Sequence, residues 1–182
     1  MAPPPKKEPR TGFFASPRKI LYAFTFGLIG ACTAVELGLV SQQLHHYGNF
    51  LSRYPTQEYK SALDLLLFAC LWQLLIVIFH YQLPSLLVAF ATLSSGVFWG
   101  AGAGIIERVS PFEFYNCGEP ASYFNSIWAP FKHECARIVT IQGFGWTLWA
   151  LSVFLLLGII VDNVEFHVKT RPFYPLTDEE KA

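Results

Sequence analysis

The chain has few charged residues and none of the short motifs that mark the common enzyme classes. Charged residues make up 14% of its 182 positions, and 13 lysines and arginines balance 13 aspartates and glutamates. A neutral chain has no overall positive field to attract nucleic acid. The sequence contains no glycine loop with a phosphate-binding lysine, no HExxH zinc motif and no GxSxG nucleophile motif. We therefore expect no catalysis, no cofactor and no nucleic-acid partner.

Charge is scarcest in four apolar stretches, each long enough to cross a membrane. Hydrophobic residues make up 53% of the chain and the mean hydropathy is +0.36, more apolar than an ordinary soluble domain. A helix of about 20 apolar residues crosses the hydrocarbon core of a bilayer. We predict an all-α, polytopic membrane protein whose four-transmembrane-helix bundle occupies one domain, residues 20–171. The predicted spans are residues 20–44, 62–81, 85–106 and 138–161.

Two short tails flank this domain, at residues 1–19 and 172–182. The first contains five prolines and five lysines or arginines against one glutamate, which predicts a disordered basic segment. Its cations either bind anionic lipid or only set the topology. The two ends of the chain carry eight lysines and arginines outside the spans, whereas the two loops on the opposite side carry five. This bias predicts cytoplasmic termini, in the plasma membrane or in secretory and endosomal membranes.

Two of the spans carry small residues four positions apart, which fall on one face of a helix. Small side chains let a neighbouring helix approach closely, although glycine is also commoner in membrane helices in general. We interpret both faces as helix-packing surfaces and expect each to be the partner of the other, within or between protomers. The residues are Gly30, Ala34 and Gly38 in the first span and Thr92, Gly96, Gly100 and Gly104 in the third.

Two polar residues interrupt the spans. A carboxylate in mid-membrane costs about 2.5–3.5 kcal/mol on insertion scales, so Glu36 is expected to face the bundle interior or to lie shallow. It is either a proton- or cation-responsive site or, as we prefer, a residue near the outer interface, because Gln42 and Gln43 follow it closely. Gln73 is expected to hydrogen-bond across helices. Contact with a substrate is the alternative for Gln73.

Residues 107–137 form a long connection that is rich in aromatic residues and contains Cys117 and Cys135. Such a loop fits a position over the bundle at the level of the lipid headgroups. With cytoplasmic termini it lies in an oxidising compartment, which predicts a disulfide between the two cysteines. The rival interpretation adds His133 to them as a metal site, but three candidate ligands are few. The adjacent His45 and His46 are a weaker metal candidate, because their side chains point about 100° apart on a helix.

The arrangement of spans, turns and cysteines resembles the MARVEL-type four-span family, especially its small fungal members. The matching features are the basic N-terminal tail, the glycine-rich Gly27–Ala31 stretch and the tight turn at residues 82–84 between spans two and three. The long second loop with Cys117 and Cys135 and the tail after the fourth span also match. The chain lacks the Cys-Cys-Gly loop of tetraspanins and the first-loop cysteine pattern of claudins. The resemblance covers residues 18–171 and is one of architecture.

That resemblance implies work in membrane apposition, lipid-domain organisation or trafficking, with no catalytic residues. We therefore expect a non-enzymatic protein that acts through helix packing and contacts with the lipid bilayer. Its protein partners would be further copies of itself or other membrane proteins. The alternatives are a small transporter or channel subunit that uses Glu36 and Gln73, and an accessory subunit of a membrane complex.

Overall fold

The computed structural model describes the backbone of residues 17–170 and contains four long helices in that range. They are α1 (Pro17–Tyr47), α2 (Gln57–Phe79), α3 (Ser85–Val109) and α4 (Cys135–Thr170). Three short 3₁₀ helices lie in the connections, η2 (Leu51–Arg53), η3 (Ala121–Tyr123) and η4 (Ala129–Glu134). The predicted C-terminal tail lies outside the described residues. So does the predicted N-terminal tail, except for the first turn of α1.

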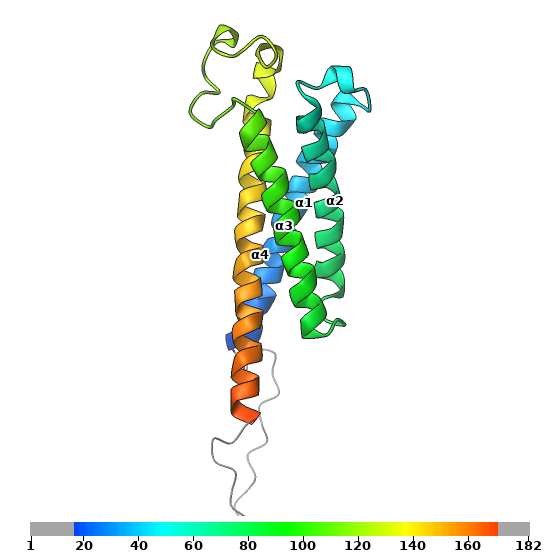
Figure 1. The fold of residues 1–182 in the computed structure, drawn as a ribbon, viewed down its shortest axis with the longest axis vertical. Coiled ribbons are helices and arrows are strands. Elements are labelled where there is room, and N and C mark those ends of the chain that lie inside the picture. The colour runs from blue at the N-terminus through cyan, green and yellow to red at the C-terminus, as the bar shows by residue number, and fades with distance from the viewer. Residues whose placement is uncertain (1–16, 171–182) are drawn as a thin grey trace, which may run out of the picture.

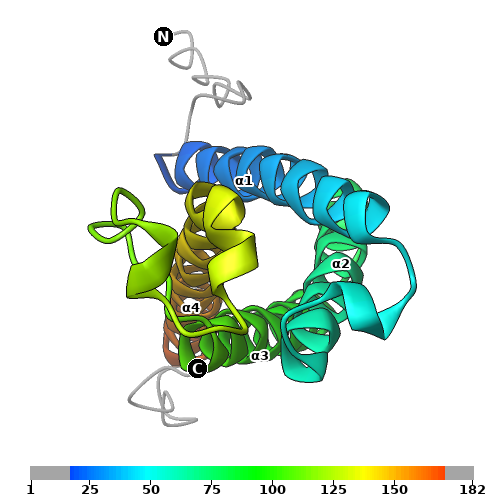
Figure 2. The ribbon, with the colours of Figure 1, turned by 90° about the horizontal axis from the view of Figure 1, so that it is seen from above.

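The four helices form an antiparallel bundle in which neighbours in the sequence are neighbours in space. α3 packs between α2 and α4, and α1 closes the ring by packing on the same two helices. Seen from above, α1 and α3 face each other diagonally (Figure 2). The two loops that contain the 3₁₀ helices lie together at one end, and α1 begins and α4 ends at the other (Figure 1). The described chain therefore enters and leaves the bundle on one side.

All four helices are long and apolar enough to cross a membrane. The candidate spans are Ile20–Tyr47, Gln57–Phe79, Ser85–Val109 and Ala129–Val161. This confirms the predicted all-α fold with four apolar helices. Helices suit the apolar interior of a membrane because they satisfy their own backbone hydrogen bonds.

Helix ends account for most of the difference between predicted and observed bounds. α2 begins at residue 57, five positions before the predicted start, because Thr56 caps it by accepting a 3.1 Å hydrogen bond from the amide of Tyr59. Its first turns contain Glu58 and Lys60, and Lys60 forms a 2.9 Å ion pair with Asp64. Charged residues in a helical turn outside the apolar stretch leave no hydropathy signal, so the sequence pattern placed the start too late.

The turns at both ends of the bundle follow from local residue chemistry. Gly48 adopts a left-handed conformation (φ +65°) and its amide donates to the carbonyl of Leu44, which ends α1. At the opposite end, the amide of Gln82 donates to the carbonyl of Phe79, and Pro84 provides the extended residue before α3. The predicted tight hairpin between the second and third spans is therefore confirmed.

The small residues of α3 face α4, where our prediction placed the first span. A Cβ atom built on Gly96 would lie 3.7 Å from Ser152, and one on Gly100 would lie 2.9 Å from Cδ1 of Trp149. Thr92 is buried in the same face, whereas Gly104 has open space beside it. Within one protomer the two small-residue faces are not partners, because α1 and α3 lie diagonally across the ring; a partnership between protomers stays a prediction.

The small residues of α1 point mainly outward. A Cβ atom built on Gly30 would lie 3.4 Å from Val77 of α2, which is ordinary contact. Ala34 and Gly38 are exposed, and a Cβ atom on Gly38 would meet nothing within 4 Å. Only one end of this predicted face packs within the bundle.

Glycine at position 145 allows a close approach of α4 to α3. A Cβ atom on Gly145 would lie 3.0 Å from the Cβ of Ala103. We expect Gly145→Leu to lower the stability by about 1–3 kcal/mol, since overpacking forces rigid neighbours apart. The thermal unfolding midpoint in detergent micelles measures this loss.

Gly143→Leu is the matched control, because position 143 is on the same helix, is exposed and has nothing within 4 Å. Both variants gain the same helix propensity. Equal midpoints for the two variants would contradict close packing at Gly145.

Candidate functional site

Contacts between helices determine which residues share a level of the bundle. On the α1–α2 side Gly30 faces Val77, and on the α2–α3 side Leu66 faces Gly102. Because neighbouring helices are antiparallel, residue numbers rise along one helix and fall along the other as the distance from these contacts increases. Glu36 of α1 therefore lies within about one helical turn of the level of Gln73 on α2.

By the same register, Ser95 and Trp99 of α3 lie at this level as well. Glu36, Ser95 and Trp99 are 0% exposed and Gln73 is 1% exposed. We call these four residues the polar layer. The layer lies about three helical turns before the end of α1 at Tyr47, so Glu36 is inside the bundle. Our preferred interpretation, a residue near the outer interface, concerns the depth of Glu36 in a bilayer and stays a prediction.

Five buried polar atoms of the layer have no hydrogen-bond partner among the described residues. They are both carboxylate oxygens of Glu36, Oε1 of Gln73, Oγ of Ser95 and Nε1 of Trp99. A buried polar group left unpaired costs about 1–3 kcal/mol, and a charged one costs more. Oε1 of Gln73 therefore accepts no cross-helix hydrogen bond within the described residues, and the hydrogen bond expected of Gln73 stays a prediction. Cys70 of α2 lies within electrostatic reach of Glu36.

A heptad pattern in α1 positions Glu36. The buried residues of this helix alternate at spacings of three and four, which is the repeat of a left-handed helix seam. We call this set the α1 seam: Phe26, Ile29, Thr33, Glu36, Val40, Gln43 and Tyr47.

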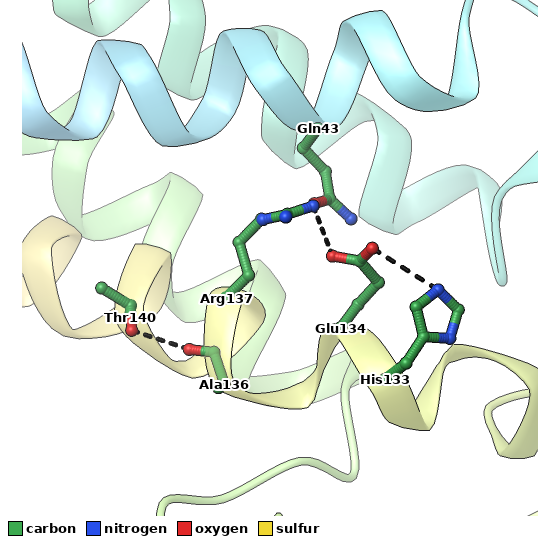
Figure 3. A network of polar contacts seen from close by, with 6 residues as sticks. All are labelled: Gln43, His133, Glu134, Ala136, Arg137 and Thr140. Atoms are coloured by element: carbon green, nitrogen blue, oxygen red, sulfur yellow. Dashed lines mark hydrogen bonds and ion pairs between the residues drawn. The ribbon is translucent and has the colours of Figure 1, made fainter.

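A second polar cluster, which we call the outer network, joins α1 to the start of α4 (Figure 3). Nη1 of Arg137 donates to Oε2 of Glu134 at 2.6 Å and to Oε1 of Gln43 at 3.3 Å. His133 lies 3.5 Å from the other oxygen of Glu134. The side chain of Glu134 is 7% exposed, and those of Arg137 and His133 are 28% and 64% exposed. The network therefore places a shielded ion pair at the loop end of the bundle.

Aromatic side chains of the long loop cover the bundle next to this network. Trp128 packs edge-on against Tyr59 of α2 and against Phe112, with ring centroids 5.5 and 5.4 Å apart. Phe131 contacts Tyr47 of α1 at 5.7 Å. These contacts agree with the expectation that the loop lies over the bundle.

Tyr54 attaches the first loop to the end of α1. The hydroxyl of Tyr54 donates to the carbonyl of Gly48 at 2.8 Å, and its ring lies 5.5 Å from that of Tyr47. Burial raises the pKa of Tyr54, so the phenol stays protonated and keeps this hydrogen bond.

The predicted cysteine pair comes together at the base of the long loop. The Cα atoms of Cys117 and Cys135 are 5.5 Å apart, which is within the range of disulfides. Cys32 is half-buried and Cys70 buried within the helices. No group of three or more metal-ligating side chains is found among the described residues. His45 and His46 are exposed near the end of α1.

Two surface cavities lie at opposite ends of the bundle. A cavity of about 330 Å³ beside the tight turn is lined by Tyr22, Phe26 and His80, and the rings of Phe26 and His80 stack at 4.1 Å. A cavity of about 710 Å³ at the loop end is lined by Glu58 and Arg108, among others. Both are shallow and open, and neither contains Glu36 or Gln73.

Sequence reasoning missed the outer network and two members of the polar layer. Gln43 and Arg137 are 94 positions apart, so no local pattern connects them. A signal did exist for Gln43, since it follows Glu36 by one heptad. Ser95 and Trp99 adjoin Gly96 and Gly100 in the third span, but no spacing of polar residues there predicted a site.

Arg137→Met should destabilise the bundle by about 1–3 kcal/mol, because it leaves the shielded Glu134 carboxylate without its guanidinium partner. Adding Glu134→Gln should restore part of this loss, as the double-mutant cycle removes the stranded charge. Thermal unfolding in micelles measures both effects. His133→Ala is the control, since an exposed pair contributes little. A loss for His133→Ala as large as that for Arg137→Met would contradict this assignment.

Comparison with known proteins identifies no family for this chain. No family model matches the sequence, and neither a curated protein nor a solved structure matches it. The resemblance to MARVEL-type proteins thus depends on the arrangement of spans, turns and cysteines, and it stays a prediction.

Proposed function

We propose that the protein is a non-enzymatic integral membrane protein that organises membrane domains or trafficking through helix packing and lipid contacts. The main support is the apolar outer surface of the bundle. Large hydrophobic side chains are exposed on the outward faces of all four helices. They include Phe24 and Val35 of α1, Phe68 and Ile78 of α2, Leu86 and Phe90 of α3, and Phe154 and Leu157 of α4.

A surface of this kind requires an apolar environment. Soluble monomers rarely expose contiguous apolar patches above a few hundred Å², whereas here exposed large hydrophobic side chains surround the half of the bundle that is farther from the two loops, within residues 20–35, 68–79, 86–97 and 146–161. Lipid tails or the spans of other membrane proteins would cover it. The exposed Ala34 and Gly38 of α1 would let a neighbouring helix approach its backbone closely. Assembly into oligomers fits this face.

The loop end of the bundle suits the membrane–water interface. The aromatic loop and the outer network gather at one end, where amphipathic rings are favoured. We place this end on the exoplasmic side and the termini in the cytoplasm, because of the lysine and arginine bias. A MARVEL-type role at the plasma membrane or in secretory membranes is part of the same proposal.

A small transporter or channel subunit is the second candidate. The polar layer favours it, because Glu36 and Gln73 put unpaired oxygens at mid-bundle. An accessory subunit of a membrane complex would be recognised by the partner that purifies with it.

Reconstitution separates the first two candidates. The fluorescently labelled chain is placed in giant vesicles that separate into two lipid phases, and in proteoliposomes loaded with a pH- or potassium-sensitive dye. We expect the protein to concentrate in one lipid phase or at its boundary, and to leave ion flux at the level of empty liposomes. Flux that is present in the wild type and lost in Glu36→Gln would overturn the proposal.

The proposed orientation also predicts a disulfide between Cys117 and Cys135. Their Cα separation of 5.5 Å permits the bond without backbone movement. Mass spectrometry of the non-reduced protein from its native membrane should find the linked peptide, and alkylation should label only the cysteines within the helices. Free thiols at Cys117 and Cys135 in the native protein would contradict both the bond and an oxidising side for this loop.

A further inference from the structure

We propose that the polar layer is a proton-binding site in which Glu36 is a neutral carboxylic acid at neutral pH. The layer consists of the buried Glu36, Gln73, Ser95 and Trp99 at one level of the bundle. This inference goes beyond the proposed function and does not depend on it.

The first argument is charge. An ionised carboxylate inside an apolar bundle needs a cation beside it. Among the described residues, Glu36 has neither a salt bridge nor a hydrogen-bond donor, although both of its oxygens are buried. The facing residues offer no charge: α2 contributes Cys70 and Gln73, and α4 contributes the apolar Leu148 at this level. A proton neutralises Glu36 where no basic side chain does.

The second argument is the balance of donors and acceptors. With Glu36 ionised, the unpaired atoms include four oxygens that can accept a hydrogen bond, whereas two groups can donate one, Ser95 Oγ and Trp99 Nε1. A proton on Glu36 raises the number of donors from two to three. The proton therefore adds the donor that the layer lacks.

The third argument is position. Glu36 belongs to the α1 seam, in which every member is less than 10% exposed, and Val40, Gln43 and Tyr47 lie between it and the loop end. A side chain in this seam cannot reach the interface by extending its own carbons. Glu36 therefore holds its proton in the interior.

The direct test is the infrared spectrum of the full chain in lipid nanodiscs at pH 7. Exposed carboxyl groups titrate near pH 4, so they are ionised at this pH. We expect the wild type to show one carboxylic-acid carbonyl band that shifts in D₂O, and Glu36→Gln to lose it. Glu58→Gln, at an exposed position in the first turn of α2, should lose only carboxylate bands.

Several results would overturn the proposal. One is a wild-type spectrum without an acid band at pH 7, which can be read even if Glu36→Gln does not fold. Another is a loss of carboxylate bands in Glu36→Gln equal to that in Glu58→Gln. The third result concerns metal ions. If Glu36 carries a proton, the thermal unfolding midpoints of the protein should be equal in sodium, potassium and choline chloride. A stabilisation by sodium or potassium that Glu36→Gln lacks would replace the proton by a metal cation.

Discussion

Close contact between α3 and its two neighbours is the constraint on which the bundle depends. On one side Gly102 leaves room for Leu66 of α2, and on the other Gly145 of α4 leaves room for Ala103. Helices surrounded by lipid gain little from hydrophobic burial against one another, so van der Waals packing between small residues has to hold them. The diagonal position of α1 follows, because α3 has already engaged α2 and α4 through these contacts.

The polar residues of the chain are arranged around this packing. The ion pair and amide of the outer network lie at the loop end of the bundle, and the polar layer lies inside the bundle. The carboxyl groups of Glu134 and Glu36 differ in chemistry because they differ in position. Glu134 has the guanidinium of Arg137 beside it, whereas Glu36 has no basic side chain beside it among the described residues.

Hydropathy was sufficient to predict the four helices and the short hairpin between the second and third, because both depend on runs of local residues. The start of α2 was missed, since Glu58 and Lys60 form a helical turn without an apolar signature. The small-residue spacing predicted a packing face on α3 but could not name its partner, which depends on the order of helices around the ring. For the polar layer, the heptad that continues from Glu36 to Gln43 was a readable signal. The neighbours of Glu36 on α2 and α3 depend on the register between helices, which no local stretch of a single sequence encodes.

The length of α4 has a consequence for what the protein presents to its surroundings. Its apolar part ends at Val161, but the helix continues through nine further residues to Thr170 and extends past the other helices (Figure 1). At 1.5 Å per residue this extension adds about 13 Å. A bilayer around the apolar spans would leave this part of α4 in water as a projecting helix. Any partner that binds this projecting part would then meet the protein outside the hydrocarbon core.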